Sequence, residues 1–115
     1  MIQHIPNYDQ LIRKVISTPG GFSFISASLI LEQKSIKVFN LADSNSSKYV
    51  PAFVKGSPNL NAFRSGNYPL TRKIFVAHKE GDAWEQNAGE AYVSFLNTQG
   101  QKLIEQSGFV PLRQF

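Results

Sequence analysis

The chain has 115 residues, of which 42% are hydrophobic and 17% charged. This composition is typical of a globular domain rather than of a disordered segment, and the length suits a single domain. The formal net charge is +4, but the basic residues are scattered, so no basic arm for nucleic acid is predicted. Cysteine is absent, which excludes disulfides, thiolate metal sites and cysteine nucleophiles.

Neither a membrane span nor a signal peptide is visible. The longest apolar stretch, residues 22–31, contains three serines and is too short to cross a bilayer. Residues 1–8 lack the basic segment and following apolar run of a signal peptide. Taken as it stands, the chain is therefore expected in the cytoplasm, without membrane insertion.

The first half of the chain predicts alternating helices and strands. Asn7 is a favourable cap for a helix over residues 8–17, which the sequence TPGG then ends. Residues 22–25 predict a short buried strand, residues 29–33 a short helix and residues 36–41 a second strand. This βαβ-like order favours an α/β layer. An extended segment over residues 49–56 and a loop with one helical turn over residues 57–62 follow.

The second half predicts one strand and two helices. Residues 73–78 (KIFVAH) are the most favourable strand in the chain. Gly81 and Asp82 open a helix over residues 83–97, and a second helix covers residues 99–106, with Gly108 as its C-cap residue. Core packing is expected for Phe75 and for the apolar face of the longer helix, which carries Trp84, Ala88, Ala91, Tyr92 and Phe95.

No catalytic or metal site is predicted. His4 and His78 have no carboxylate at the spacing of a metal site or a dyad, and no two acidic residues are marked as a general acid/base pair. We therefore expect a protein that is not an enzyme and that carries no metal or cofactor.

Four residues are candidate ligands for an anion. Ser26 and Ser28 follow a predicted strand and open a predicted helix, where hydroxyl and N–H groups can bind phosphate. A plain serine N-cap is the more common role of serines at such a position. Ser65 precedes Gly66 and Asn67, which form either a backbone nest for an oxyanion or an ordinary turn. Arg72 is the fourth candidate.

Several segments occur in the order found in one known family. They are TPGGFSF at residues 18–24, YPLTRKIFV at residues 68–76, GEAYVSFL at residues 89–96, and GQKLI at 100–104 with GFVPL at 108–112. This series resembles the C-terminal region of phosphate-type periplasmic solute-binding proteins, most closely a cyanobacterial branch, and extends over residues 9–113.

The resemblance implies a partial type II periplasmic-binding fold of the α/β class. Residues 1–67 would end one lobe, residues 68–72 would cross between lobes, and residues 73–115 would complete part of the other lobe. The family's phosphate-binding turns have no counterpart in this sequence, so the resemblance transfers no ligand residue. An incomplete fold of this kind is expected to be completed by domain swapping in a homo-oligomer.

Two functions remain open. The first is the C-terminal region of the solute-binding component of a phosphate ABC transporter, which in full length captures phosphate or a similar oxyanion in the periplasm and delivers it to a permease. The alternative is a stand-alone interaction or regulatory domain derived from such a protein, without transport activity.

Overall fold

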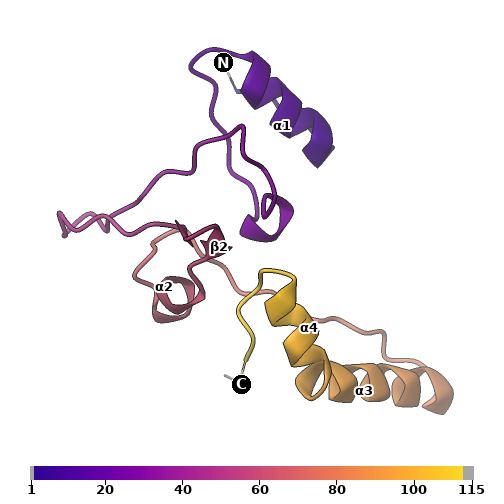
Figure 1. The fold of residues 1–115 in the computed structure, drawn as a ribbon. Coiled ribbons are helices and arrows are strands. Elements are labelled where there is room, and N and C mark those ends of the chain that lie inside the picture. The colour runs from indigo at the N-terminus through magenta and orange to yellow at the C-terminus, as the bar shows by residue number, and fades with distance from the viewer. Residues whose placement is uncertain (1, 113–115) are drawn as a thin grey trace.

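The computed structural model describes residues 2–112. Its elements, in chain order, are helix α1 (Tyr8–Ser17), the 3₁₀ turn η1 (Ala27–Leu29), strands β1 (Phe53–Val54) and β2 (Ser57–Pro58), and helices α2 (Leu60–Ser65), α3 (Ala83–Asn97) and α4 (Gly100–Gln106). Within the described residues the architecture is therefore mixed, with helices and one small antiparallel sheet. Figure 1 shows α1 and the α3–α4 pair projecting in different directions from the middle of the chain.

Helix α1 confirms the predicted bounds. The side chain of Asn7 accepts hydrogen bonds from the backbone N–H groups of Asp9 and Gln10, which satisfies two otherwise unpaired donors of the first turn. Only Ile12 of the apolar stripe is buried, while Ile16 is half exposed. The helix is thus specified locally by its cap more than by packing.

A small core forms in the middle of the chain. Ala52, Ala62 and Tyr68 are buried, and partly buried apolar residues surround them: Leu41, Val50, Phe53 and Phe63. Leu41 and Val50 form an isolated antiparallel bridge that closes the loop of residues 42–49. The Tyr68 hydroxyl donates to the carbonyl oxygen of Phe39 at 3.2 Å, and its ring meets Phe63 edge to face.

Strands β1 and β2 form a hairpin that contacts this core through Phe53. Phe53 pairs with Pro58 and Val54 with Ser57, around a two-residue turn made of Lys55 and Gly56. Both turn residues have positive φ, 52° and 80°, which is the backbone twist that a tight hairpin favours. Glycine adopts this conformation freely, whereas a lysine side chain makes it unfavourable.

Gln101 joins the two C-terminal helices to the chain that follows them. Its side chain is 2% exposed. Its amide nitrogen donates to the carbonyl oxygen of Leu96 in α3 at 2.7 Å, and its amide oxygen accepts from the N–H of Leu112. Gly108, with φ at 86°, turns the chain after α4 and lies against Leu31 and Ser28, so the end of α4 contacts the η1 region.

The three predicted strands at residues 22–25, 36–41 and 73–78 are wrong. These segments have no strand structure, apart from the single bridge at Leu41. A strand exists only when its backbone groups bond to a neighbouring strand, and the described residues supply no such partner here. The predicted helix at residues 29–33 is replaced by η1, and the βαβ-like order by an antiparallel hairpin.

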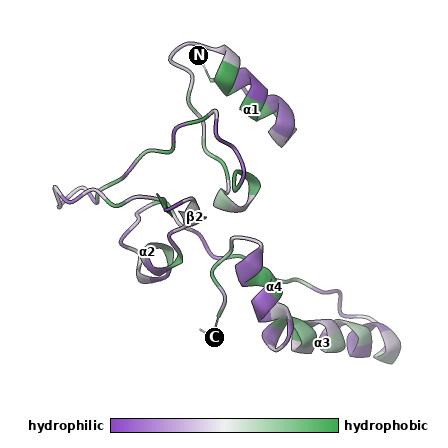
Figure 2. Cartoon of the chain, viewed as in Figure 1, coloured by the Kyte–Doolittle hydropathy of each residue, from purple (hydrophilic) through white to green (hydrophobic). Residues whose placement is uncertain are grey.

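The predicted core packing of the α3 face is also wrong. Trp84 is 78% exposed, Tyr92 58% and Phe95 40%, and Phe75 in the preceding segment is 82% exposed. Figure 2 shows hydrophobic stretches both on helices and on unpaired chain that no second layer covers. The described chain therefore leaves much of its apolar surface in contact with solvent.

Candidate functional site

Ser26 and Ser28 lie next to each other, as predicted, but at a 3₁₀ turn rather than a full helix. Their hydroxyl oxygens are 3.0 Å apart, and both residues are half buried. Ser26 occupies the N-cap position of η1, as predicted, but its side chain makes no capping hydrogen bond. A three-residue turn exposes too few aligned N–H groups to act as an anion site by itself.

Ser65 lies at the C-terminal end of α2, followed by the left-handed residue Gly66. Its hydroxyl donates to the carbonyl oxygen of Ala62 and accepts from the N–H of Asn67, both at 3.3 Å. These bonds form an ordinary helix-ending turn. The negative end of a helix dipole also disfavours an anion there.

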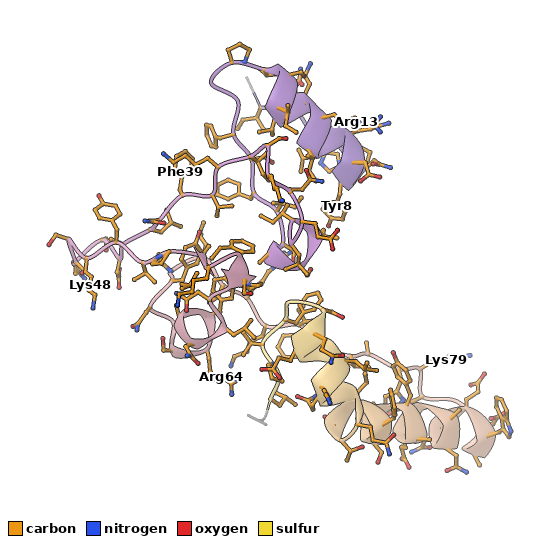
Figure 3. All side chains as sticks on the ribbon, viewed as in Figure 1. Tyr8, Arg13, Phe39, Lys48, Arg64 and Lys79 are labelled. Carbon is orange, nitrogen blue, oxygen red and sulfur yellow. The ribbon has the colours of Figure 1, made fainter. Side chains whose placement is uncertain are left out.

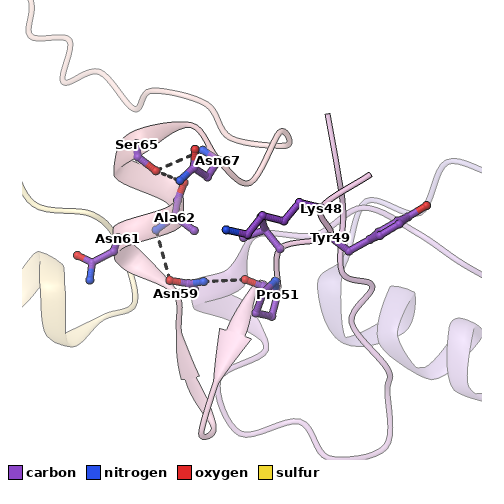
Figure 4. A pocket seen from close by; sticks show the side chains of 9 residues that line it. Lys48, Tyr49, Pro51, Asn59, Asn61, Ala62, Ser65 and Asn67 are labelled. Carbon is purple, nitrogen blue, oxygen red and sulfur yellow. Dashed lines mark hydrogen bonds between the residues drawn. The ribbon is translucent and has the colours of Figure 1, made fainter. Parts of the chain in front are cut away.

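An open hollow of about 450 Å³ borders Ser65. It lies between residues 48–51 and helix α2, and its polar lining consists of Lys48, Asn59, Asn61, Ser65 and Asn67. Figure 4 shows the Lys48 side chain directed toward α2, whereas the Tyr49 ring points away.

Asn59 builds the hollow. Its amide nitrogen donates to the carbonyl oxygen of Pro51 at 2.9 Å, and its amide oxygen accepts from the N–H of Ala62 at 3.3 Å (Figure 4). It therefore caps α2 and fixes the helix against the preceding segment at once. The bonds of Asn59 and Ser65 are internal, which leaves Lys48 and the exposed amides as donors for a ligand.

The hollow offers a ligand one ammonium group and two exposed side-chain amides. Within residues 2–112 the Lys48 ammonium makes no ion pair, because the one salt bridge there joins Lys79 and Glu85. A lone, solvated ammonium with amide N–H donors attracts phosphate or sulfate but discriminates poorly between them. Neither Lys48 nor Asn59 was predicted from the sequence, although the Asn-Leu-Asn-Ala run at residues 59–62 is a recognisable N-cap signal.

Arg72 lies apart from the other candidates. It is exposed, in a stretch without secondary structure, and it does not line the hollow that includes Ser65. Figure 3 shows the labelled cations Arg13, Lys48, Arg64 and Lys79 spread over separate parts of the molecule. The structure thus brings Ser26 and Ser28 together but does not bring Ser65 or Arg72 to them.

Two further features are absent from residues 2–112. No group of three or more histidine, cysteine, aspartate and glutamate side chains is placed to hold a metal ion. No helix in the same part of the chain has the length and hydrophobicity needed to cross a membrane.

Comparison with known proteins adds no relative. No protein-family model matches the chain, and no significant match was found among curated proteins or solved structures.

Proposed function

We propose that the chain is the C-terminal region of a phosphate-type solute-binding protein of an ABC transporter. In the full-length protein, two α/β lobes of the type II periplasmic-binding fold close on phosphate or a similar oxyanion in the periplasm and deliver it to the permease. Residues 1–67 end one lobe, residues 68–72 cross between the lobes, and residues 73–115 belong to the other. The chain contributes scaffold, without catalysis.

The placement of the motif residues carries this proposal. Tyr68 of the YPLTR segment is buried in the central core, and Gln101 of the GQKLI segment is 2% exposed. Gln101 bonds to the backbone of Leu112, the last residue of the GFVPL segment, so two fragments of the resemblance form one hydrogen-bonded unit. The residues that resemble the family therefore have packing and hydrogen-bonding roles, as a shared scaffold requires.

The extended chain after Tyr68 supports the crossover. Residues 69–82 have no helix or strand, and residues 71–80 are all exposed. A proline at position 69 stiffens the start of this stretch.

A calorimetric titration with phosphate, sulfate and molybdate tests the proposal in two arms. The chain alone is expected to give no binding heat, because it lacks the family's phosphate-binding turns. The chain fused behind the N-terminal region of a phosphate-type binding protein is expected to bind phosphate. A fusion that melts cooperatively but gives no heat and no phosphate-dependent melting shift would refute the family assignment.

A variant of Lys48 distinguishes binding in the hollow from binding in the cleft between the two lobes of the full-length protein. If the chain alone binds an oxyanion, and Lys48→Ala abolishes the heat while Lys34→Ala does not, the hollow is an autonomous site. The chain is then more than scaffold, and that part of the proposal is wrong.

The alternative, a stand-alone interaction or regulatory domain, has one observation in its favour. Large apolar side chains are exposed over α3 and residues 74–76, which suits an interaction surface. Failure of the fusion to bind phosphate, together with saturable self-association of the chain, would favour this alternative.

A further inference from the structure

Residues 72–80 have a sequence that favours a strand but no strand partner. Residues 71–80 are all exposed. The exposed fractions of the apolar residues at the centre are 70% for Ile74, 82% for Phe75 and 53% for Val76. Among residues 2–112, the backbone groups of this segment make no hydrogen bond to another strand. β-branched and aromatic residues favour pairing, and an unpaired apolar edge is a template for another strand.

The surface area of the chain exceeds that of a compact protein of the same mass. The accessible surface is 9637 Å², whereas a compact protein of 12.9 kDa exposes about 6,300 Å². The surplus is about 3,300 Å², which is more than the roughly 1,000–2,500 Å² that obligate homodimers bury from each copy, so one such interface would cover part of it. The radius of gyration, 17.5 Å against about 13 Å for a compact domain, agrees with this excess.

We propose that residues 72–80 pair antiparallel with the same segment of a second copy, with Val76 opposite Val76. This register is compatible with a two-fold axis between the copies. Such an axis requires opposite residues to point to the same face, so their residue numbers must both be even or both be odd. It places Arg72 opposite Glu80 at both ends of the ladder and Ile74 opposite His78. One face then has an apolar centre and a pair of opposite charges at each end, a self-complementary arrangement.

Neighbouring arrangements lack this complementarity. Moving the axis to Phe75 places Arg72 opposite His78 and Glu80 opposite Leu70. Moving it to Ala77 places Glu80 opposite Ile74 and Arg72 opposite Asp82, whose carboxylate already accepts the N–H of Glu85 as the cap of α3. A parallel in-register pair would place each arginine opposite its own copy. Charge therefore favours a second copy in one orientation and one register.

The other face has an unfavourable pair, Lys73 opposite Lys79, which the structure partly compensates. Lys79 lies 3.7 Å from Glu85 of its own chain, so its charge is partly neutralised. His78, on the complementary face, packs its ring against Gly89 of α3, where an added Cβ would lie 2.8 Å from Nδ1. Helix α3 of each copy therefore lies on the side of the complementary face.

Charge reversal tests the register. Sedimentation equilibrium of the full chain is expected to show a dimer. Arg72→Glu or Glu80→Arg creates two symmetry-related repulsive pairs and is expected to weaken dimerisation about tenfold. The double variant Arg72→Glu/Glu80→Arg restores attraction and dimerisation. Lys34→Glu, an exposed reversal elsewhere, is expected to have no such effect. A monodisperse monomer at about 100 μM, or failure of the double variant to recover, overturns the proposal.

The absence of cysteine allows an independent measurement. Cα atoms of directly opposite residues lie about 4.5–5.5 Å apart, within disulfide range. Val76→Cys is therefore expected to form a disulfide-linked dimer rapidly under mild oxidation. Ala77→Cys, which lies opposite Phe75 rather than its own copy, is expected to cross-link more slowly. Equal rates for the two variants would exclude the register, and dimerisation without either cross-link would place the interface elsewhere. Neither readout depends on phosphate, so this test is separate from that of the proposed function.

Discussion

Replacing Gln101 by alanine tests whether one buried amide holds the C-terminal helices together. The substitution removes a donor to the Leu96 carbonyl oxygen and an acceptor for the Leu112 N–H. Each bond contributes about 1 kcal/mol. The Leu96 carbonyl oxygen and the Leu112 N–H both lose their bond to Gln101, a residue that is 2% exposed. We therefore expect the free energy of unfolding to fall by about 2 kcal/mol, and the melting temperature by about 10 °C.

The measurement is thermal and urea unfolding followed by far-UV circular dichroism. Gln99→Ala is the matched control, because Gln99 is the same residue type, exposed, and makes no side-chain capping bond at the start of α4. Its effect should stay within about 0.5 kcal/mol. If Gln101→Ala and Gln99→Ala have equal effects, the buried amide contributes nothing and the reasoning is refuted.

Gln101→Glu adds a pH readout. A carboxylate still accepts from Leu112 but cannot donate to Leu96, so the variant should be destabilised at neutral pH. Burial and the lost donor both favour the protonated acid, which raises its folded-state pKa above the unfolded value. The variant is then most stable below the unfolded-state pKa of the new carboxyl group. It loses stability as the pH rises through the folded-state pKa of that group. The difference in the free energy of unfolding between the variant and the native chain should therefore become smaller toward about pH 4. A difference that does not change with pH would contradict this account.

Two further predictions concern the central core and the hairpin. Burial raises the pKa of Tyr68, so its contribution to stability is full below the unfolded pKa of about 10 and is lost as the pH rises through the folded value. Tyr68→Phe should lower the free energy of unfolding by about 1 kcal/mol at neutral pH, because the bond to Phe39 is lost. In urea unfolding, the variant should also lose less stability than the native chain as the pH rises above about 10. An equal loss in both chains would show that other groups cause it. Lys55→Asn should stabilise the hairpin by about 0.5 kcal/mol in thermal unfolding, because asparagine tolerates positive φ, and a lowered melting temperature would contradict this.

Local signals in the sequence predicted helices α1, α3 and α4 well. Asn7 and Asp82 each accept hydrogen bonds from the first turn of the helix that follows, so the starts of α1 and α3 depend on residues that are adjacent in the chain. Gly108 has positive φ after α4, as its position in the pattern indicates. Such features require no knowledge of distant parts of the molecule.

Strands and the hollow could not be predicted in this way. The apolar run at residues 73–78 has strand propensity, but propensity does not supply a neighbouring strand. The short hairpin escaped prediction because its turn contains Lys55 instead of the usual asparagine or aspartate. Lys48 and Asn59 border the same hollow only because the chain folds back between them, which no local pattern encodes.

The exposure of residues 74–76 has an evolutionary consequence. Side chains that are mostly exposed to solvent experience little selection for packing within their own chain, and random substitution would replace Ile74, Phe75 and Val76 by polar residues. An isolated monomer would in fact gain from that change, because a bare apolar strand promotes aggregation. Among close relatives, persistence of apolar residues at these three positions would therefore record selection exerted by a second polypeptide surface.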